Sequence, residues 1–269
     1  MNIDRSNYYS WQKKYNPCKN QEFNQALKEV FKLSDKTFGY RRMHIAMKSL
    51  GFMQNEKIIR KSMKLLNLHC EIRPKKKFYK KVEVSNRCKN YLNQKFYPTK
   101  PNSCYTVDIT YLQTQKGMVY LNVIIDLFGK IPIAYLSSYN CDSKLAEDTI
   151  DILVKKKKSV KNAIIHSDQG CSYLSKNYIK KLAKLKVIRS NSKKGYPFDN
   201  ACSENFFSIF KTEKFYRLNY QPKDKEEIDK IVEDYIDFYI NRRISISLNG
   251  LTPKQYYDNY IKNKKNYIN

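Results

Sequence analysis

Three acidic residues, Asp108, Asp168 and Glu204, are the side chains best suited to do chemistry in this 269-residue chain. Asp108 lies in the run YTVDIT, Asp168 in IIHSDQG, and 35 residues (169–203) separate Asp168 from Glu204. Carboxylate oxygens are the ligands that Mg²⁺ prefers, and two such ions about 4 Å apart activate the attacking oxygen and stabilise the leaving one in a displacement at phosphorus. The three acids therefore predict a site for two magnesium ions that cuts and joins DNA strands, with Mn²⁺ as a substitute metal.

The first two acids require strands to position them. Periodicity and β-branched composition predict strands over residues 104–112, 119–126, 131–137, 163–166 and 186–189, with helices over 143–157 and 175–185. Such an order gives an α/β fold, a mixed five-stranded sheet with flanking helices. Asp108 then lies within the first strand and Asp168 at the carboxyl end of the fourth, where open α/β sheets usually bind ligands. One Asp at a strand end is more often structural than catalytic, so the prediction depends on all three acids together.

The third acid requires a helix. After a loop over residues 191–198, Asp199 or Asn200 can cap a helix that carries Glu204, Ser208 and Lys211 on one face. Three phenylalanines lie on the opposite face and should anchor the helix: Phe206, Phe207 and Phe210. Asn200 and Ser208 are therefore candidates for supporting roles.

His166 has two interpretations. It could orient Asp168 or a metal-bound water, or it could be a hydrogen-bonded core residue at the end of a buried strand. The sequence leaves both open.

The first 70 residues form a separate helical segment. Helices are predicted over residues 20–33, 40–50 and 55–66, and the last two flank a turn at Gly51. This is the outline of a helix-turn-helix that binds DNA, although an ordinary helical hairpin with a charged surface has the same pattern. The basic residues available to phosphates include Arg41, Arg42, Lys57, Arg60 and Lys61.

Two further segments complete the predicted organisation. Residues 71–100 have the composition of a basic linker, and residues 101–216 form the catalytic core. Residues 217–269 form a helical extension, with helices over 225–241 and 254–261. Arg242 and Arg243 end the first of these helices and are candidate DNA contacts.

The net charge is +27, and residues 1–100 contribute 24 Lys or Arg against 7 Asp or Glu. This excess favours a polyanionic partner, nucleic acid before an anionic membrane surface, although a lysine-rich proteome explains part of it. The seven cysteines include no C-x-x-C pair, which indicates reduced thiols in a cytoplasm. No apolar run approaches the ~18 residues of a membrane span.

The run from Asn191 to Glu213, NSKKGYPFDNACSENFFSIFKTE, resembles the signature of bacterial insertion-sequence transposases with a retroviral-integrase-like core. It is most similar to the second reading-frame product (OrfB) of the insertion sequence 3 family. The run SNYYSW at 6–11 is similar to the start of that family, FGYRR at 38–42 to its helix-turn-helix-like segment, and residues 239–253 to its C-terminal motif. The chain departs from the family at Tyr105, Val107 and Ser245, where Trp, Thr and His are usual.

The resemblance implies a ribonuclease-H-like fold, a DDE triad at Asp108, Asp168 and Glu204, and a DNA contact by Lys211, seven residues after the glutamate. It also implies a transposase that acts on double-stranded DNA, at element ends and target, as a homo-multimer. Members of the family are joined to an upstream-frame (OrfA) product by frameshifting, so that product is an expected partner. With only three histidines, the integrase-type zinc module is not expected.

Two rival functions remain at this stage. One is a ribonuclease-H-like nuclease, and the other is a catalytically reduced copy that binds DNA as a repressor. The basic N-terminal segment favours transposition over the nuclease, and the presence of all three acids favours it over the repressor.

Overall fold

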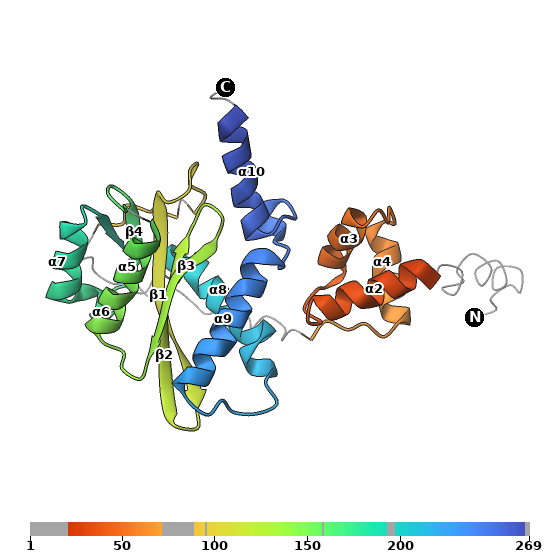
Figure 1. The fold of residues 1–269 in the computed structure, drawn as a ribbon, viewed down its shortest axis with the longest axis horizontal. Coiled ribbons are helices and arrows are strands. Elements are labelled where there is room, and N and C mark those ends of the chain that lie inside the picture. The colour runs from red at the N-terminus through yellow and green to blue at the C-terminus, as the bar shows by residue number, and fades with distance from the viewer. Residues whose placement is uncertain (1–20, 72–88, 95, 158, 193–196, 267–269) are drawn as a thin grey trace, which may run out of the picture. The chain divides into compact units, whose positions relative to one another are not determined.

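The structure, a computed structural model, describes residues 21–71, 89–94, 96–157, 159–192 and 197–266 (Figure 1). It comprises two compact units. The N-terminal unit contains residues 1–72 together with residues 244–250, and the core unit contains residues 73–243 and 251–269. Most of the predicted basic linker, residues 72–88, lies outside the described residues, as does the run at 6–11. Within the described ranges, no helix is long and apolar enough to cross a membrane.

The N-terminal unit contains three helices, α2 (Gln21–Leu33), α3 (Tyr40–Ser49) and α4 (Glu56–Leu65), as the sequence predicts. Asn55 caps α4, since its side chain accepts a hydrogen bond from the backbone N–H of Ile58. Gly51 follows α3 with φ +90°, a left-handed conformation that glycine adopts without strain. The core of the unit is apolar and consists mainly of Phe23, Leu27, Phe31, Met43, Met47, Ile59 and Met63.

The core unit is organised around a five-stranded mixed sheet, which confirms the predicted fold class. Its strands are β1 (Cys104–Thr114), β2 (Gly117–Asp126), β3 (Ile131–Ser138), β4 (Ile164–Ser167) and β5 (Ile188–Asn191), in the order β3-β2-β1-β4-β5. The first three strands are antiparallel neighbours, whereas β4 lies parallel to β1 and β5 parallel to β4. β5 begins two residues later than predicted, because Lys186 adopts a positive φ in the turn that precedes the strand.

Helices pack on the sheet, and Figure 1 shows α5 (Ser143–Lys157), α6 (Cys171–Leu174) and α7 (Lys176–Lys184) close together. Their apolar side chains cover the face of β1 that carries Tyr105 and Val107. Asp142 caps α5, since its side chain accepts a hydrogen bond from the N–H of Leu145. One detail differs from the predictions, because the short α6 precedes the helix predicted over 175–185.

Neighbouring residues of a strand point to opposite faces, so Thr106 and Asp108 belong to the other face of β1. The helix that meets this face is α8 (Ala201–Glu213), which follows the short 3-10 helix η2 (Pro197–Asn200). After the turn η3 (Phe215–Arg217), α9 (Lys225–Asn241) packs against α8 through the ring pairs Phe206–Tyr239 and Phe210–Tyr235. The chain then passes through η4 (Ile246–Leu248) to α10 (Pro253–Asn266). The sheet thus presents Asp108 toward the helix that carries Glu204.

Candidate active site

Strand pairing brings the first two acids together. In the parallel pair of β1 and β4, Cys104 is opposite Ile164 and Thr106 is opposite His166. The same register, continued two residues beyond the paired segment, brings Asp168 beside Asp108, and adjacent strands lie about 4.8 Å apart. Two acids 60 positions apart in the sequence therefore become neighbours at one edge of the sheet.

The carboxylate of Asp168 is held by the turn that follows it. Its Oδ1 accepts a hydrogen bond of 2.9 Å from the N–H of Gly170, and its backbone oxygen accepts one of 2.8 Å from Nδ2 of Asn191. A Cβ atom at Gly170 would lie 3.0 Å from Oδ1 of Asp168, a contact tight enough that the carboxylate would have to shift. Sequence reasoning did not identify Gly170 or Asn191 as support, although the glycine in the run SDQG was a local signal for such a turn.

Asp108 lies in a strongly negative environment. Burial, followed by the nearby charges of Asp168 and Glu204, raises the pKa of its carboxyl to about 7. A hydrogen bond from the N–H of Ile109 and the ammonium of Lys211 act in the opposite direction. Burial and Asp168 also raise the pKa of Glu204. The three predicted acids therefore affect one another electrostatically.

Thr106, on the face of β1 that carries Asp108, fixes the start of α8. Its hydroxyl donates to Oδ1 of Asn200 and lies 2.9 Å from the hydroxyl of Ser203, and all three side chains are buried. The prediction that Asn200 caps the helix through its side chain is wrong, because no such cap bond forms and its carboxamide is bonded to the sheet instead. Asn200 supports the site by tying α8 to β1, one turn before Glu204.

The described residues hold no preformed metal cluster. No group of three or more His, Cys, Asp and Glu side chains among them is close enough to hold an ion. The donor chemistry nevertheless fits a hard divalent cation, because three carboxylates share one negative region in which Asp108 is partly buried. DNA oxygens and water would have to complete the coordination, as is usual for Mg²⁺.

Lys211 lies on α8 with Glu204, two turns further along. Its ammonium is 4.5 Å from the centre of the Tyr111 ring, and it lies near enough to Asp108 for each charge to change the pKa of the other. Burial lowers the pKa of Lys211 and Asp108 raises it. Ser208 is exposed on the same helix, and its backbone oxygen accepts from the hydroxyl of Thr212. Glu204, Ser208 and Lys211 are thus less buried than the three phenylalanines, as predicted.

His166 has the contacts of a hydrogen-bonded core residue. It is fully buried, with Nδ1 2.9 Å from the hydroxyl of Ser190 and Nε2 3.0 Å from that of Ser192. The Ser190 oxygen already accepts two N–H groups, from Tyr91 and Leu92, so we assign its own proton to Nδ1 and the imidazole proton to Nε2. Burial lowers the pKa of His166 to about 4, which keeps the ring neutral. Its hydrogen bonds join β4 to β5 and to the residue after it, not to the Asp168 carboxylate.

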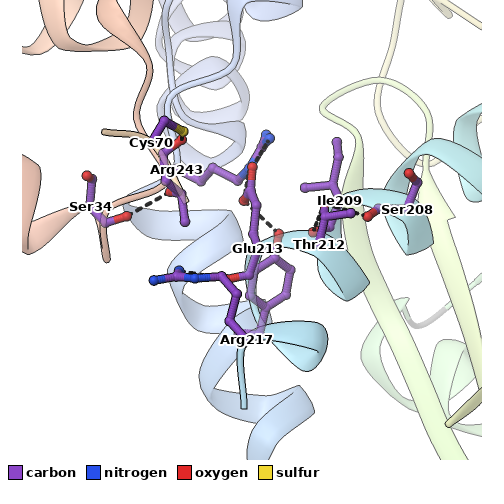
Figure 2. Close-up of polar contacts among 10 residues, drawn as sticks. Ser34, Cys70, Ser208, Ile209, Thr212, Glu213, Arg217 and Arg243 are labelled. Carbon is purple, nitrogen blue, oxygen red and sulfur yellow. Dashed lines mark hydrogen bonds and ion pairs between the residues drawn. The ribbon is translucent and has the colours of Figure 1, made fainter. Parts of the chain in front are cut away.

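The C-terminal end of α8 is held by a buried ion pair (Figure 2). Nε and Nη2 of Arg243 donate to the two carboxylate oxygens of Glu213 at 2.7 and 2.8 Å, and the hydroxyl of Tyr235 donates to the same carboxylate at 3.0 Å. The prediction that Arg243 contacts DNA is therefore corrected. The side chain is 5% exposed, and its charge is already neutralised inside the protein. Its neighbour Arg242 is exposed, forms a surface pair with Asp237 and lies 5.4 Å from the centre of the Phe238 ring.

Three of the candidate DNA contacts of the N-terminal unit lie against aromatic rings. The guanidinium groups of Arg41 and Arg60 each lie 5.6 Å from the centre of the Tyr40 ring, and Arg42 lies 5.8 Å from that of Phe38. Lys57 is exposed on α4, and Lys61 is half-buried on the same helix. At Arg41 and Arg60, contact with the ring engages the flat face of the guanidinium rather than its N–H edge, an arrangement suited to phosphates.

Three family descriptions match the chain. Residues 98–197 and residues 204–260 match integrase core domains, and residues 18–77 match an HTH-like domain. The first two matches include Asp108, Asp168 and Glu204, and the third includes α2, α3 and α4.

Known proteins are similar over most of the chain. The putative transposase InsK of insertion sequence element IS150 from Escherichia coli K12 is 31% identical over 94% of this chain and 89% of its own length. The transposase InsF of insertion sequence IS3A from the same organism is 31% identical over 95% of this chain and 91% of its own length. Among solved structures, the HTLV-2 integrase catalytic core domain in complex with magnesium covers 59% of this chain and 98% of its own, with 14% identity and a TM-score of 0.43.

Proposed function

We propose that this chain, which belongs to the insertion sequence 3 family of transposases, cuts and joins DNA at the ends of its element with Asp108, Asp168 and Glu204. The members of this family are DNA transposition enzymes with a DDE integrase core and a helix-turn-helix domain. The observation that carries the proposal is the proximity of these three carboxylates, which come from β1, from the end of β4 and from α8. Beyond the effect of burial, Asp168 and Glu204 raise the pKa of Asp108, and Asp168 raises that of Glu204. Burial and two neighbouring acids raise the pKa of Asp108 although the N–H of Ile109 and the ammonium of Lys211 act against them, and carboxylates perturbed in this way are concentrated at functional sites.

We further propose that these carboxylates hold two Mg²⁺ ions, for which Mn²⁺ substitutes. When bound, the ions supply activation of the attacking oxygen and stabilisation of the leaving one. The residues of the chain do the rest. Asp168 is oriented by Gly170 and Asn191, and Glu204 is carried on a helix that Thr106 fixes to the sheet. Their shared negative charge favours a divalent cation over a monovalent one.

Lys211 is proposed to bind a phosphate of the DNA end. Its ammonium is half-buried and near Asp108, so a phosphate that contacts it would lie within reach of the carboxylates. On the N-terminal unit, Arg41, Arg42, Lys57, Arg60 and Lys61 are proposed to bind the backbone of duplex DNA, and Arg242 is a further candidate on the core unit. These contacts increase affinity and contribute little to sequence choice.

The active form is proposed to be a homo-multimer on double-stranded DNA, because one site acts on one end at a time and paired ends must be held together. The upstream-frame product of the family is proposed as a partner that supplies preference for the terminal repeats. A competition assay at one salt concentration, with terminal-repeat and scrambled duplexes, compares the chain alone with the fusion. Strong selectivity by the chain alone would mean that the N-terminal unit reads bases itself. The reaction is expected in the bacterial cytoplasm, on the nucleoid.

The triad is tested by Asp108→Asn, Asp168→Asn and Glu204→Gln in a Mg²⁺-dependent strand-transfer assay on labelled DNA ends. Each amide keeps the size of the side chain and removes the charge, so cleavage and joining should be lost while DNA binding remains. Asp234→Asn, an exposed acid on α9, is the matched control and should retain activity. Near wild-type joining by any triad variant would remove that residue from the site. Cleavage without joining by the wild-type protein would favour a nuclease, and binding without cleavage would favour a repressor-like copy.

A further inference from the structure

Tyr111 is an exposed aromatic residue beside the candidate active site. It lies on β1, three residues after Asp108, and 62% of its surface is exposed, whereas its strand neighbours Thr110 and Leu112 are buried. Three residues of a strand span about 10 Å, which is about three nucleotides of stacked DNA. Asp108 and Tyr111 point to opposite faces of β1, but the Lys211 ammonium lies close to both, so the ring and the carboxylates are linked through Lys211.

One face of the ring is already in use. The Lys211 ammonium lies 4.5 Å from the ring centre, a cation–π distance, and the same ammonium influences Asp108. An aromatic ring has two faces, and an exposure of 62% leaves most of the remaining surface open to solvent. The open surface of Tyr111 is thus held next to a cation suited to a phosphate.

The edge of the sheet is also open at this point. The pairing of β1 with β4 ends at Thr106, so the segment from Asp108 to Tyr111 extends past its parallel neighbour in the described part of the chain. A flat aromatic group beside a basic group, on an unpaired strand edge, is the arrangement that proteins use to bind unpaired nucleotides. The base stacks on the ring while the cation binds the backbone.

We propose that Tyr111 stacks against a base within about three nucleotides of the phosphate that reacts, while Lys211 contacts that strand's backbone. The proposal deepens the proposed function, on which it rests, by assigning a base contact to the core unit. Stacking accepts every base, because each has a flat face, so Tyr111 adds affinity and alignment of the strand without sequence choice.

The chain supplies a matched control. Tyr97 is 71% exposed and has the ammonium of Lys130 4.7 Å from its ring centre, so its exposure and its cation contact are similar to those of Tyr111. Lys130 lies after β2, whose last residue, Asp126, pairs with Tyr105 near the start of β1. Tyr111 lies toward the other end of β1, so the control pair is remote from it. A general effect of removing an exposed tyrosine would appear in both variants.

The probe is a duplex oligonucleotide that carries the fluorescent base 2-aminopurine at one of the last few positions of one end, measured with the full chain in Ca²⁺ so that no chemistry occurs. Stacking on an aromatic ring quenches this base. We expect quenching at one position with the wild-type protein, with Tyr111→Phe and with Tyr97→Leu. Tyr111→Leu should lose the quenching and bind the end roughly five- to 150-fold more weakly, the loss that corresponds to one base–aromatic stack.

Three outcomes would overturn the proposal. Quenching that persists in Tyr111→Leu would show that another group stacks on the base. Binding by the wild type without quenching at any position would exclude stacking while leaving the proposed function intact. Reduced strand transfer by Tyr111→Leu with unchanged quenching and affinity would show that Tyr111 only positions Lys211. A wild-type protein that binds no DNA at all would instead overturn the proposed function itself.

Discussion

Removal of one partner of the ion pair between Glu213 and Arg243 should be one of the most destabilising single substitutions in the core unit. The side chains of Glu213 and Arg243 are 2% and 5% exposed, and two charged hydrogen bonds and the Tyr235 hydroxyl join them at the end of α8 (Figure 2). Desolvation lowers the pKa of Arg243, but its bond to Glu213 outweighs this, so the guanidinium stays charged. Arg243→Met removes the cation and leaves a buried carboxylate without its main partner.

Removing one partner of a buried pair costs about 3–5 kcal/mol, because the remaining charge loses its compensation without regaining water. The unfolding temperature of a unit of this size falls by about 2–4 °C per kcal/mol, so Arg243→Met should lower it by roughly 6–20 °C. Arg242→Met is the matched control. Both partners of its surface pair with Asp237 are 59% exposed, and such pairs contribute about 0–1 kcal/mol.

The assay is thermal and urea unfolding of the full chain, followed by circular dichroism. A triple variant, Glu213→Leu, Arg243→Met and Tyr235→Phe, removes every polar member of the cluster and should recover most of the stability, because an apolar replacement leaves no buried charge. A loss of less than about 1 kcal/mol for Arg243→Met, similar to that of Arg242→Met, would refute the reasoning. So would a triple variant as unstable as the single one.

Three other predictions concern the site. The pKa of Asp108 is about 7 in the folded protein and about 3.9 in the unfolded chain. Between these two values the folded state retains a proton that the unfolded state has lost. This group therefore lowers stability progressively as the pH rises from ~4 to ~7. Asp108→Asn should therefore raise the metal-free unfolding temperature above pH ~7, and equal unfolding temperatures across this pH range would contradict the assignment. Gly170→Ala should reduce strand transfer with little loss of stability, since its Cβ would displace the Asp168 carboxylate. Gly39→Ala is the control and should leave strand transfer unchanged, because a Cβ there would have no atom within 4 Å. Equal activities of the two variants would exclude the contact. Lys211→Ala should weaken DNA binding and reduce the slope of log affinity against log salt by about 1, and an unchanged slope would remove Lys211 from the interface.

The sequence by itself predicted the sheet, which the structure confirms, and it supplied the proposal of the three acids. Helices at 143–157 and 225–241 have the bounds that their periodicity predicts, and the β-branched runs around Asp108 predict the strands of the antiparallel hairpins. These features depend on short stretches of chain, in which the spacing of apolar residues and the turn residues decide the local conformation. The choice of Asp108, Asp168 and Glu204 also needed only residue types and spacing.

Only the tertiary structure decided which partners the polar side chains have. Arg242 and Arg243 are adjacent and identical in type, yet one is exposed and the other is paired with Glu213, 30 residues away. Asn200 could have capped its own helix, but Thr106 from β1 bonds its carboxamide instead, and His166 bonds two serines of the neighbouring strand and loop. A buried polar group forms hydrogen bonds with whichever partner the packed fold brings within about 3 Å. The local pattern of the sequence does not indicate which distant segments will pack together.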